Sequence, residues 1–291
     1  MIDALKKLWQ FRSLVCSKLM DALGILMLLW GILDIMIPED DLSCCWRICI
    51  IVLIVAASLI YALWKFFHQP QSLELEINKR TILKVEKGDI FALSENEACV
   101  IPVNEYFDTH VGDGIINPKS VHGKFLSIFD NNILQIREDI DKQLSGVLNL
   151  PSNRKRTMID GLPQKRYPLG TCVRIINKER IFILVAVTRF NKDEHVDVAA
   201  EEYPEVIRKM YNGIENLHDG KAVYVPLVGS GISGYQLNEM QLLNTIIQAA
   251  YNADKLAITN GIHICIYGDE MWNKLNLNVI EYLYDKWKTL K

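Results

Sequence analysis

The sequence predicts a mixed α/β domain preceded by a pair of membrane-spanning helices. Two apolar runs, each close to the ~20 residues needed to cross a bilayer, lie near the N-terminus. From residue 73 onward, short β-branched runs alternate with segments in which apolar residues recur at helical spacing. A glycine-rich loop joins one of the later strands to the helix after it. These observations together indicate one α/β domain attached to a membrane hairpin.

The N-terminal part contains three segments. Residues 1–18 are basic and amphipathic, which predicts either a helix lying on a cytoplasmic membrane surface or a positive flank to the next segment. The runs at about 19–37 and 46–67 are the predicted spans. Asp34 lies near the end of the first run, where a carboxylate costs less than at the bilayer centre. It is either a functional group of an oligomeric assembly or an interface-level residue, and we prefer the second interpretation.

The charges that flank the two spans predict their orientation. Basic residues precede and follow the pair: Lys6, Lys7, Arg12, Lys18, Lys65, Lys79 and Arg80. The connecting loop is acidic, with Arg47 as the basic exception. Because basic flanks stay on the cytoplasmic side, we expect both termini in the cytoplasm. The expected location is the cell inner membrane or plasma membrane, with the lipid bilayer as a partner of this multi-pass chain.

Residues 68–72 look like a short linker, and 73–291 read as one domain. The predicted strands are 73–77, 81–86, 98–103, 171–176, 181–187, 223–228 and 262–266. The predicted helices are 120–144, 196–217, 237–251 and 270–287. Their alternation favours a mixed sheet with helices on both faces. The basic segment 153–166 is either a solvated loop or a contact with anionic lipid.

Composition excludes several function classes. The net charge of −3 argues against non-specific binding of nucleic acid. The 7 cysteines form no C-x-x-C pair and no cluster with histidine at metal-ligand spacing. We therefore expect reduced thiols used as small apolar residues, with no metal site and no cofactor.

The segment from Val223 to Tyr235 combines a strand, a glycine loop and the start of a helix. Glycines let a backbone approach a ligand closely, and backbone N–H groups at such a loop can bind phosphate. A tight turn without any ligand is an equally good explanation of the loop alone. A dinucleotide-binding unit is rejected, because this loop comes late in the chain and Asp254 precedes the last strand instead of ending it.

Several stretches in the same order resemble a macro domain, the ADP-ribose-binding fold, over about residues 73–291. Gly88-Asp89-Ile90 resembles the family's first motif, and Val103-Asn104 resembles the start of its ribose loop. Gly112-Asp113-Gly114-Ile115 stands where the family has its first glycine loop, and Tyr167–Thr171 resembles the segment that opens the next strand. Gly229–Tyr235 resembles the second loop, which holds the diphosphate.

The resemblance implies a ligand site and assigns roles within it. Asp89 would accept from the adenine amino group, and the two glycine loops would present N–H groups to a diphosphate. Taken alone, Asp89 would be read as a helix N-cap or turn residue. The implied ligand-binding residues are Asp89, Ile90, Asn104, Gly112, Asp113, Gly114, Ile115, Gly229, Ser230, Gly231, Ile232, Ser233, Gly234 and Tyr235.

Three positions depart from the pattern of hydrolytic macro domains or of many relatives. Phe107 replaces a second asparagine, and Ile116 replaces an aspartate after the glycine loop. No acid–base pair substitutes for them, so we expect a binding protein without catalytic residues. Ser233 stands where many relatives carry an aromatic residue over the distal ribose. This small residue leaves room for a larger group on that ribose.

Two membrane spans followed by a macro domain are similar to the effectors of type II Thoeris antiphage systems. That resemblance implies a TIR-domain partner that makes an ADP-ribose-derived signal, such as histidine–ADP-ribose. It also implies that signal binding drives homo-oligomerisation and membrane disruption. Two other functions stay open: a membrane-anchored ADP-ribosyl hydrolase, and a passive reader of ADP-ribosylated proteins whose hairpin is only a tether.

Overall fold

The computed structural model describes residues 12–36, 44–92, 94, 96–112, 115–129, 132–152, 162–193, 195–231, 234–253 and 255–290. The chain divides into two compact units. One consists of Met1–Gln71 together with Asn276–Lys291, and the other of Ser72–Leu275. The last helix therefore belongs with the N-terminal unit, whereas the sequence placed it in a single domain over 73–291.

The first unit contains two long apolar helices that lie side by side, α2 (Arg12–Met36) and α3 (Cys44–Phe67). Both are long and apolar enough to cross a membrane, over Arg12–Ile35 and Cys45–Phe67. Only 6% and 11% of these stretches are buried within the protein, so neither resembles a core helix of a soluble domain. Residues 12–18 belong to α2 itself and form no separate interfacial helix, while 1–11 lie outside the described residues.

Asp34 and Arg47 join the two apolar helices by an ion pair. An Arg47 guanidinium nitrogen lies 3.2 Å from a carboxylate oxygen of Asp34, and each side chain is about one-third exposed. Both residues lie near the helix ends that the 37–43 connection joins. A carboxylate that pairs with an arginine is less costly in an apolar setting than an isolated one. The interpretation of Asp34 as an interface-level residue stays a prediction.

The third helix of this unit, α9 (Leu277–Leu290), begins at the C-terminal end of α3. The Asn276 side-chain amide donates to the Phe66 carbonyl at 3.1 Å. The Asn278 amide donates to the Lys65 carbonyl at 2.7 Å and to the His68 carbonyl at 3.3 Å. The last carbonyls of a helix have no partner within it, so these two asparagines cap α3.

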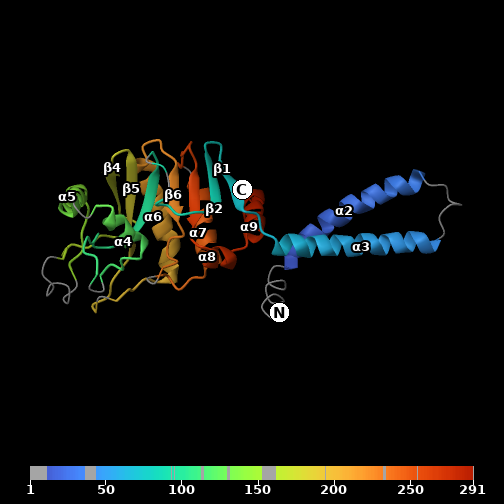
Figure 1. Ribbon diagram of the computed structural model, residues 1–291, viewed down its shortest axis with the longest axis horizontal. Coiled ribbons are helices and arrows are strands. Elements are labelled where there is room, and N and C mark those ends of the chain that lie inside the picture. Colours follow the sequence, from blue (N-terminus) through green and yellow to red (C-terminus); the bar gives the residue numbers. More distant parts are fainter. Residues whose placement is uncertain are drawn as a thin grey trace. The chain divides into compact units, whose positions relative to one another are not determined.

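The second unit contains one seven-stranded sheet in the order β1-β2-β7-β6-β3-β5-β4 (Figure 1). The inner strands β2, β7, β6, β3 and β5 run parallel, and β1 and β4 pair antiparallel with their neighbours at the two edges. The strands are β1 (Ser72–Asn78), β2 (Thr81–Lys87), β3 (Ala98–Asn104), β4 (Cys172–Asn177), β5 (Arg180–Thr188), β6 (Val223–Pro226) and β7 (Ile262–Ile266). The predicted mixed sheet is confirmed, and the predicted strands 171–176 and 181–187 pair antiparallel as β4 and β5.

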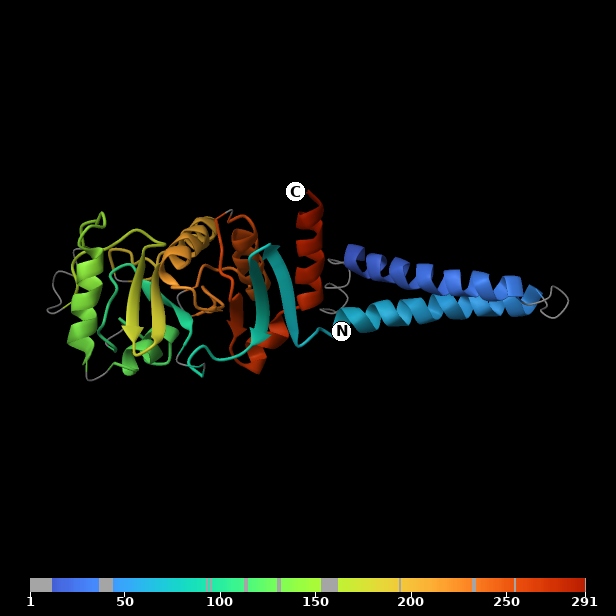
Figure 2. The same cartoon turned by 90° about the horizontal axis from the view of Figure 1, so that it is seen from above.

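Helices cover both faces of the sheet (Figure 2). On one face, α4 (Val121–Ser127) and α5 (Ile133–Leu144) pack Phe125, Ile136 and Ile140 against the inward side chains of β3, β5 and β4. The other face carries α6 (Tyr203–Leu217) and α7 (Glu239–Tyr251). Burial of these apolar side chains forms the core of the unit.

Three predicted helices have different bounds in the structure. The predicted helix over 120–144 is two separate helices, α4 and α5. The predicted helix over 196–217 begins only at Tyr203, with Pro204 in its first turn. The predicted helix over 270–287 is α8 (Asp269–Lys274) and α9.

Candidate functional site

The site lies at the edge of the sheet where the parallel strands end. Strands β2, β7 and β6 are neighbours, and they end at Lys87, Ile266 and Pro226. The next strand, β3, ends at Asn104. Because the carboxyl ends of parallel strands meet at one edge, the segments after them converge, and this edge is where α/β sheets usually bind ligands.

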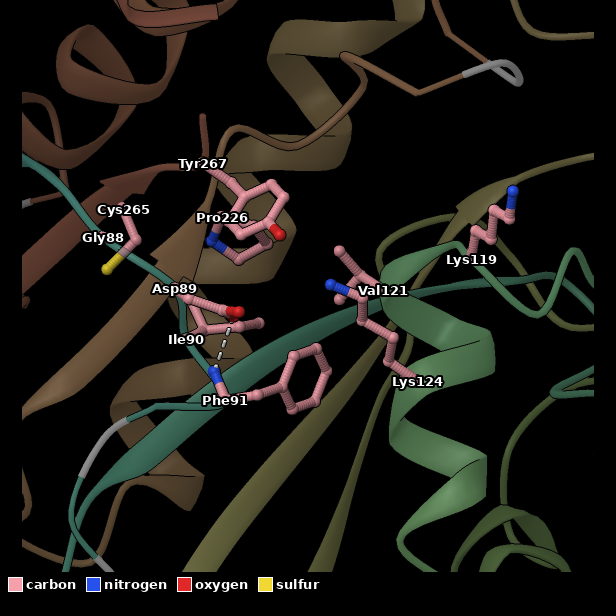
Figure 3. A pocket seen from close by; sticks show the side chains of 10 residues that line it. All are labelled: Gly88, Asp89, Ile90, Phe91, Lys119, Val121, Lys124, Pro226, Cys265 and Tyr267. Atoms are coloured by element: carbon pink, nitrogen blue, oxygen red, sulfur yellow. Dashed lines mark hydrogen bonds between the residues drawn. The ribbon is translucent and has the colours of Figure 1, made fainter. Parts of the chain in front are cut away.

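A pocket of about 100 Å³ opens beside the ends of β2, β7 and β6 (Figure 3). Its walls come from the turn after β2, from the start of α4 and from the ends of β6 and β7. The lining residues are Gly88, Asp89, Ile90, Phe91, Lys119, Val121, Lys124, Pro226, Cys265 and Tyr267. Two of the predicted ligand residues, Asp89 and Ile90, therefore lie in the pocket.

Asp89 has a structural contact as well as a place in the pocket. One of its carboxylate oxygens accepts from the Phe91 amide at 3.0 Å, and the Gly88 amide before it donates to the Ile266 carbonyl at 3.1 Å. These bonds fix the turn after β2 against β7. The side chain is half-buried and lines the pocket (Figure 3). Both sequence interpretations of Asp89, as a turn residue and as a ligand acceptor, are compatible with this geometry.

Tyr267 and Lys124 meet across the pocket from Asp89. The Tyr267 side chain is 64% exposed, which is unusual for a large aromatic residue directly after a buried strand. The Lys124 ammonium lies 4.6 Å from the centre of the Tyr267 ring. The pocket thus combines a carboxylate, an exposed aromatic face and a cation.

The second glycine loop follows β6, whose last residue, Pro226, lines the pocket. Gly229 has φ +84°, and a Cβ there would lie 3.1–3.3 Å from Leu242, Tyr203 and Tyr235. A Cβ on Gly234 would lie 2.3 Å from the Gly229 carbonyl oxygen. A Cβ on Gly231 would meet no atom of the described residues within 4 Å. Gly229 and Gly234 are therefore required by the loop's own packing, whereas Gly231 leaves space for a ligand.

Two buried tyrosines fix the position of this loop by hydrogen bonds to backbone carbonyls. The Tyr203 hydroxyl donates to the Val228 carbonyl at 2.7 Å, and the Tyr235 hydroxyl donates to the Val187 carbonyl at 2.6 Å. Burial raises the pKa of both phenols, so both stay protonated donors. Tyr235 is only 1% exposed, so a contact between this predicted site residue and a ligand would have to come from its backbone.

Asn104 organises the start of the first loop. Its amide nitrogen donates to the Asp108 carboxylate at 2.8 Å, and its carbonyl oxygen accepts from the backbone amides of Tyr106 and Asp108 at 3.1 and 3.3 Å. The side chain is 5% exposed. Its role at the ribose stays a prediction, and its bonds in the structure position the loop.

The remaining predicted residues lie on or near the two loops. Gly112 has φ +102°, and its amide donates to the Ile116 carbonyl at 2.9 Å. Gly112 and Ile115 are not among the residues that line the pocket. Ser230 donates its hydroxyl to the Leu227 carbonyl at 2.7 Å within the second loop. Asp113, Gly114, Ile232 and Ser233 lie outside the described residues.

Phe107 and Ile116, which replace the polar residues of hydrolytic macro domains, belong to the hydrophobic core. They are 0% and 3% exposed and pack in the same cluster as Phe125. The Phe107 ring meets the Tyr167 ring edge-on, with 6.0 Å between their centroids. Neither side chain has a polar group that it could direct at the pocket.

The residues that line the pocket opposite Asp89 were not predicted from the sequence. Lys119, Val121 and Lys124 come from the start of a helix that was predicted only by its apolar periodicity. Tyr267 directly follows the last strand, and an aromatic residue at the carboxyl end of a strand next to β2 is a signal that could have found it. Their approach to Asp89 depends on the strand order, which the sequence does not state.

The thiol of Cys265, which lines the pocket, is unreactive. Cys265 is 4% exposed, and burial raises the pKa of its thiol to about 12. A thiol of this kind stays protonated at neutral pH and is a poor nucleophile. Within the described parts of the chain, no three His, Cys, Asp or Glu side chains lie together as metal ligands would.

This chain is similar to several known proteins. A curated relative, Thoeris protein ThsA of Bacillus amyloliquefaciens (strain Y2), is 29% identical over 231 residues, which cover 78% of this chain and 75% of the relative. The Oceanobacillus iheyensis macrodomain with ADP matches with a TM-score of 0.48 at 16% identity, over 75% of this chain and 99% of that one. The Trypanosoma brucei macrodomain in complex with ADP-ribose matches with a TM-score of 0.40 at 15% identity, over 66% of each chain.

The family described as Thoeris protein ThsA, Macro domain, matches residues 83–267. This segment runs from within β2 to Tyr267, so it contains the whole lining of the pocket. The match covers more than half of the chain. The predicted macro domain fold is thereby confirmed, and the chain belongs to the macro domain family of Thoeris protein ThsA.

Proposed function

We propose that this chain is a membrane effector of antiphage defence whose macro domain binds an ADP-ribose-derived signal. The proposal rests on the pocket at the sheet edge. Asp89 and Tyr267 both line this pocket, and both lie within the segment that matches the ThsA macro domain. A purine could stack on the exposed Tyr267 ring while its amino group donates to the Asp89 carboxylate. Pro226 leads from this pocket to the loop at Gly229, where the diphosphate would lie.

The signal acts on the membrane part by stabilising an assembled state. Two helices with exposed apolar side chains can cross a bilayer, and several copies brought together can disrupt it. The ligand must bind the assembled state more tightly than the resting state. We place both termini in the cytoplasm of a multi-pass inner or plasma membrane protein, because basic residues flank the pair on both sides. A TIR-domain enzyme is the proposed source of the signal.

Binding without catalysis is part of the proposal. A hydrolase needs a positioned base or a residue that orients water. The positions that carry those groups in hydrolytic macro domains are Phe107 and Ile116, and both are buried in the core. This favours a sensor over an ADP-ribosyl hydrolase. Release of ADP-ribose from an ADP-ribosylated protein by the purified chain would reverse that preference.

The test is calorimetry on the full chain in detergent micelles, with ADP-ribose and histidine–ADP-ribose as ligands. Asp89→Asn keeps an oxygen for the Phe91 amide but removes the charge, so it should weaken binding at least about tenfold without unfolding the domain. Gly231→Glu places a carboxylate in the open space of the loop and should also abolish binding.

Dye release from phosphatidylethanolamine–phosphatidylglycerol vesicles distinguishes an effector from a passive reader. The ligand that binds should trigger release by the wild-type chain and not by Asp89→Asn. If the hairpin were only a tether, replacing residues 12–67 by an unrelated hairpin would leave defence in cells unchanged. Failure of the wild type to bind either ligand would refute the proposed function.

A further inference from the structure

Lys124 occupies the space where a ligand's base would lie. Its side chain extends from α4 into the pocket, and the ammonium points between the Asp89 carboxylate and the Tyr267 ring (Figure 3). The distance from this nitrogen to the ring centre is 4.6 Å, within the range of a cation–π contact. Lys119 also lines the pocket, but its side chain points away from Asp89 and Tyr267 (Figure 3).

The contact has a cost for any ligand that uses the same ring face. A purine that stacks on the pocket side of Tyr267 must displace the ammonium and replace the cation–π contact. A neutral nucleoside offers the displaced cation no new partner. A nucleotide offers phosphate oxygens, and an ammonium on a flexible four-carbon stem can turn to meet them in a charge-assisted hydrogen bond.

We propose that Lys124 is a specificity-determining residue of the nucleotide pocket. It disfavours neutral purine nucleosides, because they lose its contact with Tyr267, and it favours nucleotides, whose phosphate groups re-engage it. Specificity here is the difference between two affinities, set by one side chain that opposes the wrong ligand and assists the right one. This inference rests on the proposed function, since it concerns the same pocket.

The experiment compares adenosine with ADP as probes for the full chain in detergent micelles, by calorimetry. Lys124→Met keeps the length of the side chain and removes the charge. We expect adenosine to bind at least about threefold more tightly and ADP at least about threefold more weakly. Lys142→Met is the matched control, because it removes the charge of an exposed lysine of α5 that is not among the residues lining the pocket, and it should leave adenosine binding unchanged.

Two further variants keep the test independent of folding defects. Lys124→Arg keeps a cation that can lie over an aromatic ring, so it should retain the wild-type preference for ADP. In a Tyr267→Leu background the stacking surface is gone, so Lys124→Met should no longer improve adenosine binding, which a double-mutant cycle measures.

The outcomes separate this inference from the proposed function. An ADP-to-adenosine preference that is unchanged in Lys124→Met, or that changes equally in Lys142→Met, would overturn the role of Lys124 while leaving the nucleotide pocket in place. If the wild type bound neither ADP nor ADP-ribose, the proposed function and this inference would fall together.

Discussion

At the residue scale, the second glycine loop depends on two phenols that no solvent reaches. Tyr203 and Tyr235 are 0% and 1% exposed, and their rings lie 4.8 Å apart at the centroids. The Tyr203 hydroxyl donates to the carbonyl of Val228 in the loop after β6, and the Tyr235 hydroxyl donates to the carbonyl of Val187 near the end of β5. A buried carbonyl without a donor costs free energy, so these hydrogen bonds favour one loop position.

Tyr203→Phe should lower the free energy of unfolding by about 1–2 kcal/mol, because the buried Val228 carbonyl loses its donor. It should also weaken ADP-ribose binding, since the loop at Gly229 is no longer held. Tyr211→Phe is a matched control on the same helix: the Tyr211 hydroxyl is buried and makes no hydrogen bond with any described residue, so its removal should cost nothing. Equal losses in both variants, measured by thermal unfolding and calorimetry, would contradict this assignment.

His122 makes the domain sensitive to acid. It is 7% exposed, and burial lowers the pKa of its imidazole to about 4. In the unfolded chain this imidazole has its ordinary pKa of ~6.5. Between about pH 4 and pH 6.5 it therefore binds a proton in the unfolded chain but not in the folded chain. Stability is full above about pH 6.5 and falls as the pH drops toward 4, with a loss of roughly 2 kcal/mol at pH 5.

The measurement is the difference in the free energy of unfolding between pH 7 and pH 5. His122→Gln should reduce this difference by most of that loss, whatever its effect at pH 7. The exposed His195 is the control, and His195→Gln should keep the wild-type pH dependence. A pH dependence that persists in His122→Gln would assign acid sensitivity to other groups.

At the scale of elements, the junction between α3 and α9 rests on a pair of asparagines. Asn276 serves both helices: its oxygen accepts from the Asn278 and Val279 amides at 3.1 and 3.3 Å, while its nitrogen donates to Phe66. Asn278 is 2% exposed and supplies donors to the Lys65 and His68 carbonyls. The same side chains thus begin α9 and end α3.

Asn278→Ala leaves the Lys65 and His68 carbonyls without their side-chain donor. We expect an unfolding free energy of this unit lower by about 1–3 kcal/mol and faster hydrogen exchange over residues 65–69 and 277–280. Asn260 also donates to a carbonyl, that of Gly220, but is exposed, so Asn260→Ala is the matched control and should cost little. Unchanged exchange at 65–69 in Asn278→Ala would show that the cap contributes nothing.

At the scale of the whole molecule, the order of segments sets the topology. Basic residues lie before the first span and after the second, the stretch between the spans is acidic, and Arg47 lies near the start of α3. A fluorescent protein that matures only in the cytoplasm should be bright when fused at the C-terminus and dark when inserted at 38–42. Replacing the four lysines and arginines at 6, 7, 12 and 18 by glutamine should weaken this preference. A bright insertion at 38–42 in the wild type would contradict the orientation.

The order of the strands along the chain, the two apolar spans and the candidate loops could all be predicted before the fold was known, because each depends on local periodicity and composition. Residues such as Asp89 and Gly229 could be recognised for the same reason: a turn residue or a glycine at a strand end is visible without the fold. The split of the predicted helix over 120–144 was not visible, since α4 and α5 both present apolar residues to one core and their periodicity continues across the break.

The set of segments that form the pocket became known from the folded arrangement of the chain. Strand β7, last in the chain, pairs between β2 and β6, and this order brings Tyr267 and Cys265 beside Asp89. The packing of α4 against the core then directs Lys124 to the Tyr267 ring. Contacts between residues far apart in sequence depend on strand order and helix packing, which are properties of the whole chain and have no local pattern.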